Sequence, residues 1–92
     1  MEAKKKAELL NRVRTVSGHL KGVEKMIEQD AYCVKIIEQV QAIQAALNKI
    51  NSLVLDDHLR HCVTTAVRGE DPTERERVLS EIATMFETAS KL

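Results

Sequence analysis

The stretch 31–67 contains neither glycine nor proline, and this restricts the fold more than any other feature of the sequence. Glycine and proline are common at helix ends. Apolar residues in this stretch also recur in alternating steps of four and three. The stretch therefore predicts one long amphipathic helix. Its apolar positions are Ile36, Val40, Ile43, Leu47, Ile50 and Val54. A helix this long would leave apolar surface uncovered in a single copy, so the sequence predicts an oligomer.

A shorter helix is predicted before this stretch, over about 3–28. It repeats the same spacing of apolar residues, which suits packing against a nearly parallel or antiparallel neighbour. Only Gln29 and Asp30 separate it from the long helix over about 31–67, and so short a connection favours an antiparallel hairpin. We expect Asp30 to be the N-cap of the long helix and Cys33 to occupy its third position.

A third helix is predicted over about 72–89. Gly69 is suited to end the long helix in the left-handed conformation. The motif Asp71-Pro72-Thr73-Glu74 is typical of a helix start, with an N-cap, a proline at the first position and a capping-box glutamate.

These helices predict an all-α fold in a single domain, residues 1–92. Aromatic residues make up 2% of the chain, and three glycines and one proline leave little material for the turns of a sandwich or barrel. Two hairpins pairing as an antiparallel four-helix bundle would bury both apolar stripes. We therefore expect a three-helix protomer that forms such a dimer.

No apolar run approaches the length of a membrane span, and the first ten residues lack the apolar segment of a signal peptide. We therefore expect a cytoplasmic protein, in which two cysteines are more often free thiols or metal ligands than a disulfide. An enzyme is not expected. The sequence has no Ser/His/Asp arrangement, no glycine-rich phosphate loop and no pair of carboxylates on a buried face.

The net charge of zero is unevenly distributed along the chain. Residues 1–25 include seven basic and three acidic residues, a net charge of +4. Residues 70–92 include three basic and six acidic residues, a net charge of −3. A basic first helix is compatible with an anionic partner such as DNA, although a charged face is most often simply solvated.

Two thiols and one imidazole on the long helix form a candidate metal site. Cys33 lies in the first turn, where the helix dipole favours the thiolate, and His58 and Cys62 are four residues apart on one face. Taken singly, each is more often an ordinary core or surface residue. Cys33 and His58 are 25 positions apart, which is about 37 Å of helix. One metal ion could join all three only if a second copy ran antiparallel beside the first.

Two thiolates and one imidazole are soft donors, which favour Cu(I) first and zinc next. Zinc would need a fourth ligand such as His61, a carboxylate or water, whereas Cu(I) accepts three. His61 lies about 100° around the helix from Cys62 and is expected outside the site. His19, among polar residues of the first helix, is expected at the surface.

The same residues carry a resemblance to a known family. The segments concerned are Asn11-Arg12, Gly18-His19-Leu20, Asp30-Ala31-Tyr32-Cys33, Gln44-Ala45-Ala46-Leu47 and His58-Leu59-Arg60-His61-Cys62. They resemble the copper-sensing CsoR branch of the CsoR/RcnR family of metal-responsive repressors. The similarity extends from about residue 9 to residue 67, and the third helix matches only in character.

This resemblance implies an antiparallel four-helix dimer of three-helix protomers and a tetramer made of two dimers. It also implies a metal-free form that binds operator DNA and a Cu(I)-bound form that releases it. The Cu(I) ligands would be Cys33 of one subunit with His58 and Cys62 of the other. Tyr32 would support these ligands, together with a glutamate of the third helix, for which Glu81 is the candidate.

Related branches of the family differ at these positions. A nickel or cobalt sensor would carry histidine in place of Cys62 and an additional N-terminal histidine. A formaldehyde sensor would lack that cysteine, and a persulfide sensor would lack His58. The copper branch fits best. The alternatives are a thiol or persulfide redox-sensing repressor of the same fold, and a cytosolic copper-binding bundle that does not bind DNA.

A repressor of this kind would contact DNA without a helix-turn-helix, mainly through phosphates. The resemblance matches Arg12 and Lys49 to basic positions implicated in DNA binding. The full set of expected contacts is Lys4, Lys5, Lys6, Arg12, Arg14, Lys21 and Lys49. Sequence preference would then depend on operator shape and on symmetric spacing. The expected partners are operator DNA and further copies of the chain, with no membrane association.

Overall fold

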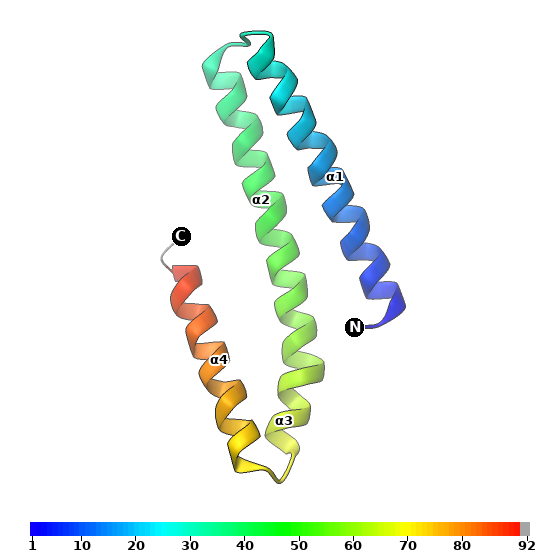
Figure 1. Cartoon of the computed structure of the whole chain (residues 1–92), viewed down its shortest axis with the longest axis vertical. Helices are drawn as coiled ribbons and strands as arrows, with labels where there is room; N and C mark the ends of the chain where they lie inside the picture. Colours follow the sequence, from blue (N-terminus) through cyan, green and yellow to red (C-terminus); the bar gives the residue numbers. More distant parts are fainter. Residues whose placement is uncertain (91–92) are drawn as a thin grey trace. The chain divides into compact units, whose positions relative to one another are not determined.

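The computed structural model describes residues 1–90, and they are almost entirely helical (Figure 1). The elements are α1 (Ala3–Glu28), α2 (Cys33–Asp57), the π-helix η1 (His58–Val63), α3 (Thr64–Arg68) and α4 (Pro72–Ser90). In the sequence, α2, η1 and α3 follow one another without a gap. The prediction of an all-α, three-helix protomer is confirmed, and the described residues contain no strand.

The chain divides into two compact units, the hairpin unit Met1–Val54 and the C-terminal unit Leu55–Leu92. In the hairpin unit, α1 and the first part of α2 lie side by side and antiparallel (Figure 1). Leu9, Val23 and Ile43 are buried there. In the C-terminal unit, α4 packs against η1 and α3, and Val63 and Val78 are buried. α2 begins in the first unit and ends in the second. Within residues 1–90, no helix is long and apolar enough to cross a membrane.

Asp30 ends α1 and is not the N-cap of α2, contrary to the prediction. Its φ angle is 53°, in the left-handed region. The backbone N–H groups of Asp30 and Ala31 donate to the carbonyls of Ile27 and Met26 at 3.1 and 2.9 Å. This is a Schellman arrangement, which satisfies the last carbonyls of a helix. Asp is one of the few residues other than glycine that tolerate the left-handed conformation.

Tyr32 takes the N-cap position of α2 in place of Asp30. Its carbonyl accepts hydrogen bonds from the backbone N–H groups of Lys35 and Ile36, at 2.9 and 3.3 Å. Cys33 is therefore the first helical residue and not the third. It still lies in the first turn, where unpaired N–H groups create a partial positive charge.

The N-cap and the first position of α4 follow the prediction, whereas the carboxylate expected to complete a capping box, that of Glu74, accepts hydrogen bonds from Arg77. Oδ1 of Asp71 accepts hydrogen bonds from the backbone N–H groups of Thr73 at 3.0 Å and Glu74 at 3.4 Å. Pro72 is the first helical residue, where its missing N–H costs nothing. Asp71 is thus the N-cap of α4.

Gly69 ends α3 in an extended conformation and not in the left-handed one. Its φ and ψ angles are −72° and 166°. A Cβ atom at this position would lie 3.3 Å from the carbonyl oxygen of Thr65. Close approach to the end of the helix, and not a positive φ, is what favours glycine here.

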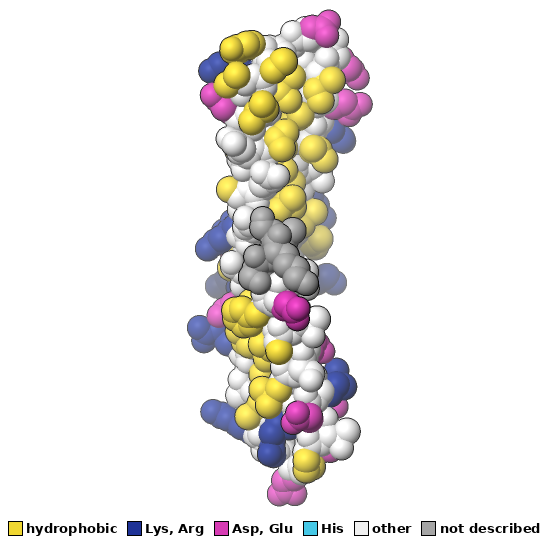
Figure 2. Space-filling view, turned by 90° about the vertical axis from the view of Figure 1, so that its left-hand side faces the viewer, with side chains coloured by type: hydrophobic (Ala, Val, Ile, Leu, Met, Phe, Trp, Pro, Cys, Tyr) yellow, Lys and Arg dark blue, Asp and Glu magenta, His cyan; other side chains and the backbone are white. Residues whose placement is uncertain are grey.

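Each predicted apolar stripe divides into two faces. Inside the hairpin unit, buried or half-buried positions repeat every seven residues: Leu9, Val16 and Val23 on α1, and Ile36, Ile43 and Ile50 on α2. The alternate positions are exposed: Val13, Leu20 and Ile27 on α1, and Val40, Leu47 and Val54 on α2. Figure 2 shows hydrophobic side chains gathered on the surface near the α1–α2 connection, at the top of the view.

Candidate metal centre

His58 opens η1 and lies beside a carboxylate of α4. Its Nε2 atom is 3.0 Å from Oε1 of Glu81, and 26% of its side chain is exposed. Nε2 itself is buried, and it makes no hydrogen bond within the described part of the chain. Among the residues expected at the metal site, the structure brings together His58 and Glu81. The contact leaves Nδ1 as the ring nitrogen that does not face Glu81.

The segment that carries His58 and Cys62 is a π-helix, which the sequence pattern did not predict. Both the backbone N–H and the Oγ1 hydroxyl of Thr64 donate to the carbonyl of Leu59, the hydroxyl at 2.8 Å. Such i→i+5 turns are rare and occur frequently at functional sites. The backbone of Cys62 belongs to η1, but its side chain lies outside the part of the chain that the structure describes.

Cys33 is a free, exposed cysteine at the first position of α2. It belongs to the hairpin unit, whereas His58 and Cys62 belong to the C-terminal unit. Tyr32 is 70% exposed in the protomer. Among the described side chains of one chain, no three His, Cys, Asp or Glu residues lie close enough together to hold a metal ion.

The other two histidines have partners of their own. Nε2 of His61 lies 3.6 Å from Oδ1 of Asp57, one turn earlier, and the side chain of His61 is 59% exposed. Nε2 of His19 donates a 2.6 Å hydrogen bond to Oε1 of Gln39. His19 is half-buried and links α1 to α2, so the expectation of a surface residue was wrong.

The seven basic residues expected to contact DNA all lie in the hairpin unit, six on α1 and Lys49 on α2. Lys5 and Arg12 are half-buried, and the other five are exposed. Nε of Arg12 is buried without a hydrogen bond, 3.6 Å from Oε1 of Glu8.

Gly18 and Gly22 of α1 have no neighbour in the described chain that would explain a missing side chain. A Cβ atom at either position would find nothing within 4 Å.

The donor atoms suit a soft metal ion. Cys33 offers an accessible sulfur at the first position of α2, and sulfur is a soft donor. His58 offers an imidazole whose Nε2 faces a carboxylate, an arrangement that commonly orients a ligating histidine. These donors fit Cu(I) better than a hard cation such as Mg²⁺, which prefers oxygen.

A sequence model described as metal-sensitive transcriptional repressor matches residues 5–88. The copper-sensing transcriptional repressor CsoR of Bacillus subtilis is 35% identical over 89 residues, covering 97% of this chain and 85% of the relative. CsoR of Mycobacterium tuberculosis is 48% identical over 67 residues, covering 73% of this chain; the chain spans only 56% of that relative's length.

Among solved structures, the crystal structure of the copper-sensing repressor CsoR with Cu(I) from Geobacillus thermodenitrificans superimposes with a TM-score of 0.88. It is 30% identical in sequence, and the match covers 98% of this chain and 91% of that one. The resemblance found in the sequence is thus confirmed at the level of the whole fold. The helical fold and the sequence relatives agree, and the chain belongs to the family of metal-sensitive transcriptional repressors.

Proposed function

We propose that the protein is a cytoplasmic Cu(I)-sensing transcriptional repressor that binds operator DNA when metal-free and releases it on binding Cu(I). The contact between His58 and Glu81 carries this proposal. It places a half-buried imidazole beside a carboxylate, on a chain of a metal-sensitive repressor family. The names of the relatives point to copper as the metal, since those from Bacillus and Mycobacterium are copper-sensing and the Geobacillus structure contains Cu(I).

The proposed ligands are Cys33 of one subunit with His58 and Cys62 of the other. The reason for two subunits is that no described group of three ligands lies together within one chain. Bound Cu(I) would supply a positive charge and a link between two chains. Within each chain, Glu81 orients the imidazole of His58, and Tyr32, exposed beside Cys33, is available to a second subunit.

An antiparallel dimer is the proposed form, and two dimers the proposed tetramer. In each protomer, one apolar position per heptad on α1 and on α2 is exposed, although its neighbour in the stripe is buried in the hairpin. Leu20 is 55% exposed and Leu47 is 47% exposed. Two rows of this kind are typical of helices that take part in a four-helix bundle, because each helix of a bundle contacts two others.

Coupling between metal and DNA requires that Cu(I) favours a conformation with lower affinity for DNA. Cys33 follows the α1–α2 turn, whereas His58 and Cys62 lie in η1. Drawing these groups together across two subunits would move α2 of one chain against α2 of the other. The basic residues of α1 would move with it, and the spacing of their phosphate contacts would change.

Replacing Arg14 and Lys21 with glutamine is expected to weaken DNA binding by the metal-free protein. Both side chains are exposed, and a spacing of seven residues places them on one face of α1. The slope of log affinity against log salt concentration should become shallower by about 0.9 for each phosphate that the protein no longer neutralises. Fluorescence anisotropy with labelled operator DNA at several salt concentrations measures this slope.

Lys35→Gln provides the matched control for those two substitutions. Lys35 is exposed on α2, and its Nζ atom lies 3.6 Å from Oε2 of Glu38. This variant should keep the wild-type slope. Equal slopes for the Arg14/Lys21 variant and the wild type would contradict a DNA-binding surface on α1.

The proposed function as a whole is tested by titrating Cu(I) into a protein–DNA complex under anaerobic, reducing conditions. Bound copper and bound DNA are followed in the same sample. One Cu(I) per protomer should bind as DNA is released. The affinity for DNA should recover after a copper chelator is added. Copper binding without any specific DNA complex would favour a copper buffer. Release that requires an oxidant or persulfide, and not copper, would favour the thiol sensor.

A further inference from the structure

The carboxylate of Glu81 is shared between two partners in the C-terminal unit. Its Oε1 atom lies 3.0 Å from Nε2 of His58, and its Oε2 atom accepts a hydrogen bond from Nη1 of Arg77 at 3.3 Å. Each oxygen therefore has its own neighbour, one on η1 and one on α4. A carboxylate contacted from both sides has less freedom to rotate than one held at a single oxygen.

Arg77 is itself anchored by Glu74. Nε and Nη2 of Arg77 donate to the two oxygens of Glu74, with the Nε–Oε2 distance being 3.2 Å. A guanidinium held at two points keeps a defined plane. The hydrogen bonds from Arg77 lower the pKa of Glu74, and the same bonds raise the pKa of Arg77. This anchoring leaves Nη1 to contact Glu81.

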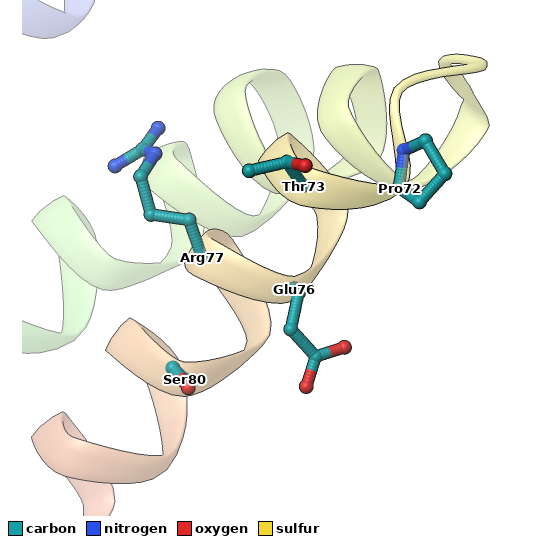
Figure 3. A pocket seen from close by; sticks show the side chains of 5 residues that line it. All are labelled: Pro72, Thr73, Glu76, Arg77 and Ser80. Atoms are coloured by element: carbon teal, nitrogen blue, oxygen red, sulfur yellow. The ribbon is translucent and has the colours of Figure 1, made fainter.

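The other side chains at the start of α4 do not form a ligand-binding site together with Arg77. A shallow surface hollow is lined by Pro72, Thr73, Glu76, Arg77 and Ser80. Figure 3 shows that Arg77 and Glu76 point away from each other there, so the charged groups do not converge on a common ligand. The neighbouring Arg75 donates to the carbonyl of Gly69 at 2.9 Å and braces the α3–α4 turn.

We propose that Arg77 is a positioning residue of the metal site. It holds Oε2 of Glu81, so that Oε1 faces Nε2 of His58 and the ring presents Nδ1 to the metal. The inference rests on the proposed function in assigning His58 as a ligand, but the orientation of the ring is a property of the metal-free protein. Arg77 is 59% exposed, and exposed ion pairs add little to stability. Replacing Arg77 should therefore change the orientation of the His58 imidazole and leave the fold intact.

The test compares Arg77→Gln with Arg60→Gln as the matched control. Arg60 is also an exposed arginine of the C-terminal unit, and its Nε atom lies 3.0 Å from Oδ2 of Asp56, away from Glu81. The first readout is the ¹⁵N spectrum of the His58 ring in the metal-free protein at alkaline pH, which reports the tautomer. Wild type and Arg60→Gln should show the proton on Nε2, beside the carboxylate. Arg77→Gln should show a mixture of the two tautomers.

The second readout is Cu(I) affinity, measured by competition with a chelator. Residues that orient metal ligands typically change affinity by about 10- to 100-fold, and we expect about tenfold weaker binding in Arg77→Gln. In a Glu81→Gln background, Arg77→Gln should have no further effect, because Arg77 acts through Glu81.

Three results would overturn the proposal: an unchanged His58 tautomer in Arg77→Gln, a copper affinity equal to that of Arg60→Gln, or an additive loss in the Glu81→Gln background. The tautomer is measured without copper. A failure of the wild-type protein to bind Cu(I) would thus count against the proposed function, while the ring spectrum still decides whether Arg77 orients His58.

Discussion

Replacing His58 with alanine should abolish the release of DNA by Cu(I) and leave DNA binding by the metal-free protein unchanged. The substitution removes the imidazole from the proposed copper ligands, and His58 lies outside the unit that carries the basic residues. Coupling between two sites typically changes affinity by about 5- to 150-fold. In His58→Ala, the ratio of DNA affinity without Cu(I) to DNA affinity with Cu(I) should fall to about one. Fluorescence anisotropy with operator DNA, with and without one equivalent of Cu(I), measures it.

His61→Ala is the matched control, because it makes the same substitution three residues later in η1. His61 is more exposed than His58, and its Nε2 atom lies 3.6 Å from Oδ1 of Asp57. This variant should respond to copper like the wild type. A copper response that survives in His58→Ala, or is lost equally in His61→Ala, would refute the assignment of His58 as a ligand.

Mixing two inactive variants tests whether the site joins two subunits. Cys33→Ser and His58→Ala chains, purified together as a heterodimer with different tags, would contain one complete ligand set and one that lacks both groups. The heterodimer should bind Cu(I) at half the wild-type stoichiometry, although neither homodimer binds it tightly. If the heterodimer also fails to bind copper, the ligands do not come from two chains in the way proposed.

A second large effect is expected from Leu47→Glu, which should convert the proposed dimer to a monomer. Leu47 is 47% exposed in the protomer and lies in the middle of the exposed row on α2. Burying a leucine contributes about 1.5–3 kcal/mol, and two-fold symmetry counts this contribution twice. We expect the dissociation constant of the dimer to rise by at least about 100-fold. Copper binding and DNA binding should be lost together, because both need two chains.

Sedimentation velocity measures the change in mass, and circular dichroism checks that the helices persist. Ser52→Glu is the control, since it adds the same charge at an exposed position outside that apolar row on α2. This control should remain a dimer. A Leu47→Glu protein with the wild-type mass would show that the exposed apolar row is not the dimer interface.

The contacts around His58 could be predicted from the sequence only in part. Glu81 was identified by resemblance, and the structure places its carboxylate 3.0 Å from His58. Arg77 was not identified as a site residue, although its spacing from Glu74 and Glu81 on a helix indicates ion pairs. Spacing within α4 shows which carboxylates Arg77 can reach. It does not show that one of them faces η1, because that depends on how the two helices pack.

The sequence by itself determined the helical class, the start of α4 at Asp71 and the family to which the chain belongs. These follow from local preferences: apolar spacing, an N-cap side chain that bonds to its own backbone, and ligand types at fixed positions. Only the tertiary structure decided which half of each apolar stripe the hairpin buries. The spacing of apolar residues shows which of them share one face of a helix, but it does not show which part of that face the neighbouring helix covers.

The conformation of Asp30 and the π-helix at His58–Val63 also depended on the tertiary structure. Asp30 lies between two helices and could cap either one, and the choice depends on the direction in which the chain turns. The π-helix places one extra residue in a turn of the helix, which local propensities do not specify. η1 and α3 pack against α4, and this packing places His58 of η1 beside Glu81 of α4.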